Sequence, residues 1–117
     1  MLRIRLAFVV LLGAAMVIVA SASAALPTLK GTDGPGFTIT LKKGTTKVTK
    51  LKAGKYKIVI RDLSKLHNFH LTGPGVNKKT GVVPKGTFTW TVTLKKGTYK
   101  FVCDPHKAIM KGSFKVT

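Results

Sequence analysis

A cysteine, a histidine and a methionine stand close together near the end of the 117-residue chain. Segment 97–112 holds Cys103, His106 and Met110 in the spacing Cys-x-x-His-x-x-x-Met. A thiolate, an imidazole and a thioether are soft and borderline donors that suit copper. Taken one at a time, they read as a small core residue, a loop histidine and an apolar core plug. Within one short loop they predict a metal site instead.

A further donor must come from elsewhere, and the chain offers only two more histidines, His67 and His70. Segment 66–72 is predicted to be a strand, in which neighbouring residues point to opposite faces. His67 shares a face with the apolar Phe69, whereas His70 lies on the other face. Two strand residues of opposite parity cannot easily bind one metal, so we select His67 rather than His70.

The resulting set is His67, Cys103, His106 and Met110. Two imidazoles and a thiolate with a weak axial thioether form the blue-copper site used in electron transfer. Copper alternates between Cu(I) and Cu(II), which prefer different geometries, so a rigid cage lets an electron move with little rearrangement. The sequence therefore predicts a type 1 copper site.

The rest of the chain supplies the elements that must position these donors. After Pro27, apolar and polar residues alternate with period two between breaks that contain Gly, Pro or Asn, which is typical of strands. The segments predicted as strands are 36–41, 46–51, 55–60, 66–72, 86–94, 99–103 and 113–117. We expect an all-β fold, a Greek-key β-sandwich of two antiparallel sheets with seven to eight strands.

Side-chain parity within these strands indicates which residues face the core. Tyr99, Phe101 and Cys103 have the same parity, so the thiol should point inward at the end of its strand. By the same pattern we expect Phe37 to face the core with Ile39. With no other cysteine in the chain, Cys103 has no internal disulfide partner.

The segment from Gly97 to Gly112 resembles the ligand loop of the cupredoxins, the group of plastocyanin, pseudoazurin, halocyanin and amicyanin. The pair formed by His67 and Asn68 is similar to the upstream ligand of that family and the asparagine after it. The resemblance implies a Greek-key β-sandwich with one type 1 copper, which carries single electrons between redox proteins. It also implies that Asn68 ties the two ligand loops together. The three residues between the histidine and the methionine of the loop give a spacing between the amicyanin-like and plastocyanin-like forms.

The same resemblance implies that electrons pass through the edge of His106, where Pro105, Ala108 and Ile109 would form a small apolar docking patch. Pro105 has a second expected role. Proline has no N–H, so it cannot donate a hydrogen bond to the sulfur of Cys103, and hydrogen bonding around that sulfur tunes the potential. We predict that Pro105→Ala raises the reduction potential if the new N–H reaches the sulfur.

The first 24 residues read as an export signal. Arg3 and Arg5 precede an apolar run from Leu6 to Ala20, and Ala22-Ser23-Ala24 fits a signal-peptidase site. The run is shorter than the about 20 residues that span a bilayer as a helix, which favours cleavage over an uncleaved anchor. We expect residues 1–24 to be a signal peptide and 25–117 a single copper-binding domain outside the cytoplasm, in the periplasm, outside the cell or at the outer face of the cytoplasmic membrane.

The chain is strongly basic, with 21 Lys and Arg residues against three acids, and it has no glutamate. Loss of Arg3 and Arg5 leaves 19 basic residues and a net charge of +16. Such a charge favours anionic partners, and we expect acidic redox proteins and an anionic envelope surface. Export argues against nucleic acid. We expect the domain to be a monomer.

Enzymatic readings fit less well. The three aspartates offer no obvious acid/base carboxylate pair, and three histidines are too few for a type 1 site together with a trinuclear copper cluster. A thiol nucleophile at Cys103 fits worse than a metal ligand, since Met110 and a distant histidine join the set. Two alternatives to an electron carrier stay open: a copper-binding or storage protein without redox partners, and a metal-free cationic binding module.

Overall fold

The structure is a computed structural model that describes residues 12–18 and 25–117. The basic start and the cleavage motif of the expected signal peptide lie outside these residues. Residues 12–18 form no helix or strand. Within the two described ranges, no helix is long and apolar enough to cross a membrane.

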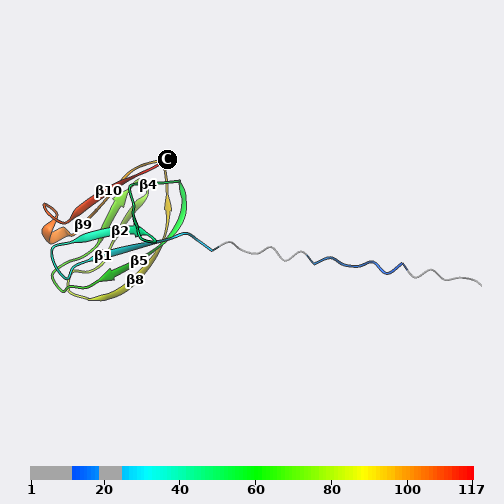
Figure 1. The fold of residues 1–117 in the computed structure, drawn as a ribbon, viewed down its shortest axis with the longest axis horizontal. Helices are drawn as coiled ribbons and strands as arrows, with labels where there is room; N and C mark the ends of the chain where they lie inside the picture. The colour runs from blue at the N-terminus through cyan, green and yellow to red at the C-terminus, as the bar shows by residue number, and fades with distance from the viewer. Residues whose placement is uncertain (1–11, 19–24) are drawn as a thin grey trace, which may run out of the picture.

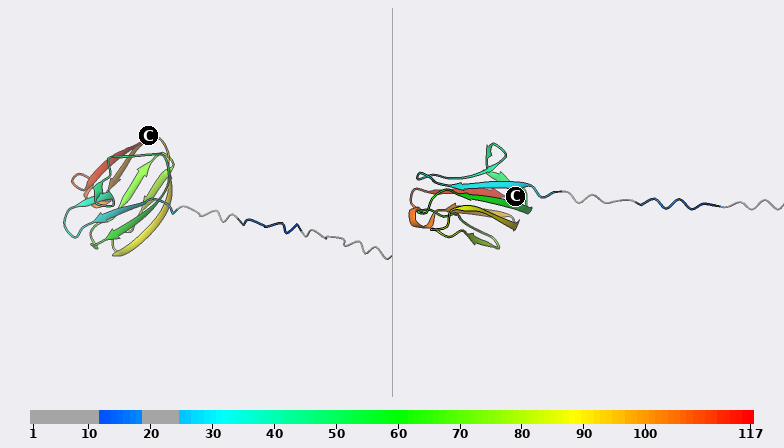
Figure 2. Two further views of the ribbon diagram at one scale, coloured as in Figure 1. Left: turned by 45° about the vertical axis from the view of Figure 1, so that its right-hand side comes forward. Right: turned by 90° about the horizontal axis from the view of Figure 1, so that it is seen from below.

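Residues 25–117 form a β-sandwich of two five-stranded sheets (Figures 1 and 2). The first sheet has the order β3-β2-β1-β5-β8 and the second has the order β4-β10-β9-β6-β7. The strands are β1 (Thr28–Asp33), β2 (Ile39–Lys43), β3 (Thr46–Lys47), β4 (Lys50–Leu51), β5 (Gly54–Asp62), β6 (His70–Gly73), β7 (Val76–Lys79), β8 (Gly86–Leu94), β9 (Gly97–Val102) and β10 (Lys111–Val116). One short 3₁₀ helix, η1 (Asp104–His106), follows β9.

The predicted all-β sandwich is confirmed, with two corrections. The described residues contain ten strands rather than seven or eight, partly because segment 46–51 splits into two two-residue strands, one in each sheet. The sheets are also mixed rather than antiparallel, because β1 pairs with β5 in parallel and β4 with β10 in parallel. Both parallel pairs arise where the chain crosses between the sheets instead of turning back in a hairpin.

The predicted inward faces are largely confirmed. Alternate residues of β5, β8 and β9 pack into one apolar core between the sheets. Tyr99 stacks on Phe114, and Phe69 stacks on Phe101, with ring centroids 5.3 and 5.4 Å apart. Cys103 follows directly after this packed end of β9 and is fully buried, as its parity predicted.

Two local predictions were wrong at the end of the sandwich that holds the cysteine. The strand expected over 66–72 begins only at His70, so His67 lies in the loop before β6. Phe37 lies outside any strand and is 60% exposed instead of facing the core. In both places the alternation of apolar and polar residues continues in the sequence beyond the end of the strand. The chain has already left the sheet there and forms a loop.

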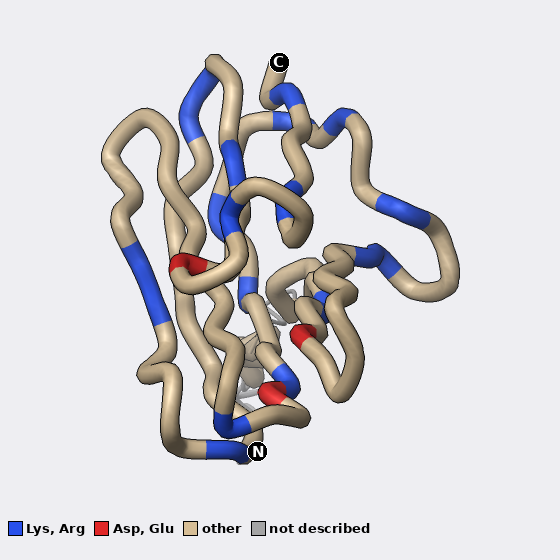
Figure 3. The backbone as a smooth tube through the Cα atoms, turned by 90° about the vertical axis from the view of Figure 1, so that its left-hand side faces the viewer, with Lys and Arg blue, Asp and Glu red and all other residues tan. Residues whose placement is uncertain are grey.

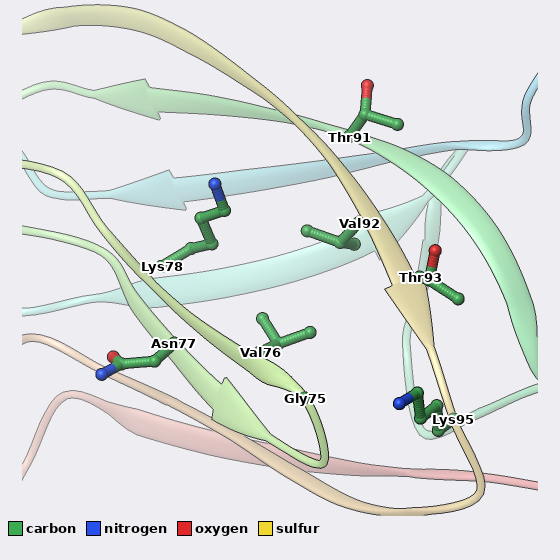
Figure 4. A pocket seen from close by; sticks show the side chains of 8 residues that line it. All are labelled: Gly75, Val76, Asn77, Lys78, Thr91, Val92, Thr93 and Lys95. Carbon is green, nitrogen blue, oxygen red and sulfur yellow. The ribbon is translucent and has the colours of Figure 1, made fainter.

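A pocket of about 420 Å³ lies away from the residues predicted to bind copper (Figure 4). It opens between β7 and β8, the edge strands of the two sheets, next to the turn at Gly75. Its lining includes Lys78, Thr91 and Lys95, but none of the predicted copper ligands. The turn from Gly73 to Val76 joins β6 to β7.

Candidate metal centre

Two loops meet at the end of the sandwich opposite the point where residues 25–27 enter β1 (Figure 1). The first loop connects β5 to β6 and carries His67. The second runs from the end of β9 through η1 into β10 and carries Cys103 and His106. Pro105 sits in the first turn of η1, where its missing N–H costs no helical hydrogen bond. In the same loop the His106 carbonyl accepts hydrogen bonds from the N–H groups of Ile109 and Met110.

The donor atoms of these three residues converge. The Nδ1 atoms of His67 and His106 are 3.1 Å apart. The Sγ atom of Cys103 lies 3.7 Å from Nδ1 of His67 and 3.6 Å from Nδ1 of His106. His67 and Cys103 are buried, and His106 is partly exposed. Among the described residues, this is the one cluster of three histidine, cysteine or acidic donors arranged to hold a metal ion.

The triangle formed by these atoms has the size that one metal ion requires. With bonds of about 2.0 Å to nitrogen and about 2.3 Å to sulfur, donors spread around an ion lie about 3.3–3.8 Å apart. The three observed separations are close to that range. Two imidazole nitrogens and one thiolate in a triangle of this size, with two of the three residues buried, fit copper.

Met110 ends the same loop and is fully buried. Its carbonyl accepts a hydrogen bond from the Cys103 N–H at 3.0 Å, and its N–H donates to the His106 carbonyl at 2.8 Å. These two bonds close the loop onto itself, so the methionine backbone is fixed against both loop ligands. The thioether is thus placed within the loop that bears the other donors.

Asn68 joins the two loops, as the resemblance implied. Its side-chain oxygen accepts from the Asp104 N–H at 2.7 Å, and its amide nitrogen donates to the Asp104 carboxylate at 2.8 Å. The same nitrogen lies 3.2 Å from the carbonyl oxygen of Thr80. The backbone N–H of Asn68 is directed at the Cys103 sulfur, with N and Sγ 3.4 Å apart. One asparagine therefore ties the loops together and also donates to the thiolate position.

His70 does not join the metal cluster, in agreement with its rejection as a ligand. Its Nδ1 lies 2.8 Å from an Asp104 carboxylate oxygen, and its Nε2 lies 2.7 Å from the side-chain oxygen of Asn77. Burial raises the pKa of Asp104, but hydrogen bonds from Asn68 and His70, with the charges of His70 and Lys79, outweigh it and leave that pKa below its ordinary value. Neither the alternation of apolar and polar residues nor the spacing of the donors predicted the hydrogen bonds of Asp104. Its position next to Cys103 was the only signal in the sequence.

Phe37 is a further residue that the sequence placed wrongly and that borders the centre. Its ring packs edge-on against both histidines, with centroids 5.4 Å from His67 and 5.0 Å from His106. Ile109, in the predicted docking patch, is 65% exposed, and Leu66 beside the buried histidine is similarly exposed. Phe37 thus packs against the partly exposed imidazole of His106, and Pro105 and Ala108, the other residues of the predicted docking patch, are exposed in the same loop as His106.

A pair of carboxyl groups lies beside the start of the loop that carries Phe37. Asp33 and Asp62 are opposite each other at the ends of the parallel strands β1 and β5, and both are fully buried. Both carboxyl oxygens of Asp33 and one of Asp62 have no hydrogen-bond partner. Burial first, and then the adjacent Asp62 carboxyl, raises the pKa of Asp33 to about 8.

The family of the chain follows from comparison with known proteins. Residues 9–116 match the family model of the cupredoxin-like domain. The chain belongs to the cupredoxin family. The expected copper cofactor is confirmed by this membership together with the convergence of two imidazoles and a thiolate. No curated protein matches the sequence.

Solved structures support the cupredoxin fold. Reduced rusticyanin is 20% identical, with a TM-score of 0.58 over 77% of this chain and 78% of its own. Rusticyanin from Thiobacillus ferrooxidans is also 20% identical, with a TM-score of 0.53 over 77% and 76% of the two chains. A multi-copper oxidase from Pediococcus acidilactici is 15% identical, with a TM-score of 0.55, covering 88% of this chain but 29% of the oxidase. At these identities the likeness concerns the fold.

Proposed function

We propose that this cupredoxin is an exported one-electron carrier with a type 1 copper bound by His67, Cys103, His106 and Met110. The observation that carries the proposal is the triangle of two Nδ1 atoms and one Sγ atom, with sides of 3.1, 3.6 and 3.7 Å. When bound, copper supplies a reversible one-electron couple.

The residues of the chain keep the cage rigid during that exchange. The loop ligands are held by the paired hydrogen bonds between the Cys103 and Met110 backbones and the His106 carbonyl. His67 is held by its neighbour Asn68, which binds the other loop through three side-chain or backbone contacts. Because both loops are fixed to each other and to a packed sandwich, the donor positions need little change between oxidation states.

Electron entry is proposed at His106, the one donor of the cluster that reaches the surface. The exposed apolar groups around it suit brief contact with a partner that must approach closely and then leave. These groups are Phe37, Leu66, Pro105, Ala108 and Ile109. We propose that Phe37 and Leu66 extend the patch predicted from the three residues of the ligand loop, because both are exposed and Phe37 packs against His106.

We propose that the partners are acidic. All 19 Lys and Arg residues of 25–117 are exposed, and they are spread around the metal end and along both sheets (Figure 3). Within the described residues, the ion pair that forms is between His70 and Asp104, so no lysine or arginine has a carboxylate partner. Unpaired positive charge steers anionic partners and speeds association at low salt. It would serve equally to hold the protein at an anionic envelope surface.

The first test is the visible absorption spectrum of the protein after one equivalent of Cu(II). We expect an intense blue thiolate-to-copper band that reductant bleaches reversibly. Cys103→Ser should lose the band, and Met110→Leu should keep it with a higher potential, because the axial donor tunes the couple. A colourless protein with a free thiol would reject the copper site.

A second measurement separates a carrier from a storage protein. A carrier should exchange electrons rapidly with an acidic redox protein, at a rate that falls steeply as salt is added. A storage protein should show slow exchange that is insensitive to salt, together with ready release of copper to a chelator. The carrier is favoured because the exposed His106 edge has no evident use in storage.

A further inference from the structure

The described hydrogen bonds include a continuous chain from the protein surface to the cysteine sulfur. It begins at the exposed Asn77 on β7, passes through His70 on β6 to the Asp104 carboxylate, and continues to the side chain of Asn68. The chain ends at the N–H of Asn68, which faces the Cys103 sulfur at 3.4 Å. Four of these five residues lie outside the proposed ligand set, and only Asn68 had an expected role.

Every hydrogen-bonding group of the Asn68 side chain is used. Its oxygen accepts from the Asp104 N–H, and its nitrogen donates to the Asp104 carboxylate and the Thr80 carbonyl. The backbone N–H of the next residue donates to the Thr80 hydroxyl at 2.9 Å. Because the oxygen and the nitrogen of the side chain are both hydrogen-bonded, the peptide group that carries the Asn68 N–H is fixed in orientation. The direction of that N–H therefore depends on where Asp104 holds the side chain.

The Asp104 carboxylate needs a second anchor, because its side chain is 39% exposed and would otherwise rotate toward water. His70 supplies that anchor from the adjacent strand, with Nδ1 2.8 Å from the carboxylate oxygen that Asn68 does not use. The far side of the His70 ring contacts the Asn77 side-chain oxygen at 2.7 Å, which fixes the ring plane. Charge-assisted bonds of this length are among the stronger ones in proteins.

We propose that His70 is a positioning residue of the metal centre, which acts through Asp104 and Asn68 to aim the Asn68 N–H at the Cys103 sulfur. The inference rests on the proposed copper function for its effect on the potential, but not for its effect on the hydrogen bond. A hydrogen bond to a ligating thiolate withdraws electron density and favours Cu(I), so it raises the potential. Loss of His70 should therefore lower it.

The test compares three variants. His70→Val removes both contacts in a residue suited to a strand. His70→Asn restores the inner contact, because an asparagine Nδ2 lies near the position of histidine Nδ1. Asn77→Ala removes only the outer contact. We expect the reduction potential to fall and the thiolate-to-copper band to move in His70→Val, to return in His70→Asn and to change least in Asn77→Ala.

A second readout does not need copper. Hydrogen exchange of the Asn68 amide in the copper-free protein should become several-fold faster in His70→Val, with His70→Asn close to the wild type. If His70→Val does not fold, His70→Gln replaces it, because its amide lies one bond further from the backbone. A merely structural role would lower the melting temperature but leave potential, band and exchange unchanged, and that result would overturn the proposal.

The two proposals fail in different ways. If the wild-type protein forms no blue band, the copper function is wrong, yet the exchange experiment still decides the role of His70. If the band forms but His70→Val and His70→Asn share the wild-type potential and exchange rate, the role of His70 is wrong and the copper site stands.

Discussion

Asp104, in the loop that carries Cys103, and the pair formed by Asp33 and Asp62 have opposite surroundings. Asp104 is partly exposed and is contacted by the side chains of Asn68 and His70. Asp33 and Asp62 are fully buried at the ends of two paired strands, and three of their four oxygens have no partner. The pKa of Asp104 is lowered, whereas that of Asp33 is raised to about 8.

The opposite pKa shifts of Asp104 and Asp33 follow from both the burial of each carboxyl group and the hydrogen bonds around it. Donors around Asp104 outweigh the effect of burial and favour the carboxylate. Around Asp33, burial is the largest cause of the raised pKa, and the Asp62 carboxyl also favours the protonated form through its hydrogen bond and its charge. Asp104 is therefore suited to act as a charged anchor for the ligand loops, whereas the fold favours the protonated form of Asp33.

The largest expected effect comes from replacing Asp33 with asparagine, which resembles the protonated acid. The folded pKa of Asp33, about 8, lies above the ordinary value of 3.8, so the folded state binds the proton more tightly. Its contribution to stability is complete below pH about 4 and is lost as pH rises through 8. One proton changes the free energy of unfolding by at most about 1.4 kcal/mol per pH unit.

Urea unfolding of the copper-free protein at pH 5 and pH 8 measures this slope. The wild type should be less stable at pH 8, whereas Asp33→Asn should remove most of the difference and be the more stable protein at pH 8. Equal slopes for the two proteins would mean that Asp33 is already charged in the fold. Asp104→Asn, which leaves the buried pair intact, is the control.

The next effect is expected at Gly34, which links the buried pair to the metal centre. Its φ of +73° is left-handed, and an added Cβ would lie 3.0 Å from Ser64 and 3.2 Å from the ring of His67. Gly34→Ala should lower the free energy of unfolding by about 1–2 kcal/mol from the strain in the backbone alone. Contact with the imidazole should also shift the copper band. Gly36→Ala is the matched control, since that site has open space and no left-handed φ.

The sequence predicted the metal loop well because its information is local. Parity along β9 placed Cys103 inward, and three residues further the chain supplies His106. His67 lies in the cluster with Cys103 and His106, although the strand on which its selection was based begins only at His70. The shared face of His67 and Phe69 still points inward because the apolar face continues into the loop, where Phe69 is fully buried.

The surroundings of the centre could not be predicted in the same way. Asp104, His70 and Asn77 meet through the pairing of β6 with its neighbours, and register is not visible in a single strand. The pairing of Asp33 with Asp62 likewise requires the parallel contact of β1 and β5, for which the alternation pattern gives no signal. Phe37 was misplaced because an apolar residue in phase with a strand was taken to belong to it.

A smaller effect is expected when Asp104 is replaced, because its side chain is 39% exposed and solvent screens its interactions. Its lowered pKa means that its contribution to stability is present above the ordinary value of 3.8 and is lost as pH falls through the folded value. Copper-free Asp104→Asn should melt below the wild type at pH 6. The gap should close as the solution is acidified below pH 3.8. A gap that stays constant with pH would assign the loss to shape rather than charge.

The smallest effect on stability is expected from the lysines, none of which pairs with an aspartate in the described residues. In the first sheet, strand register places Lys42 between Lys30 and Lys47 on an exposed face, where like charges repel. Lys42→Glu should stabilise the copper-free protein by about 0.5–1 kcal/mol at low salt, and less as salt is added. Lys43→Glu makes the same change in net charge, but position 43 faces Thr46, so this variant should be stabilised less. If both variants are stabilised equally, the effect comes from net charge and not from the pairing of the lysines across the strands. A larger gain for Lys42→Glu would show that this lysine row costs stability, as expected if the row is kept for an anionic partner.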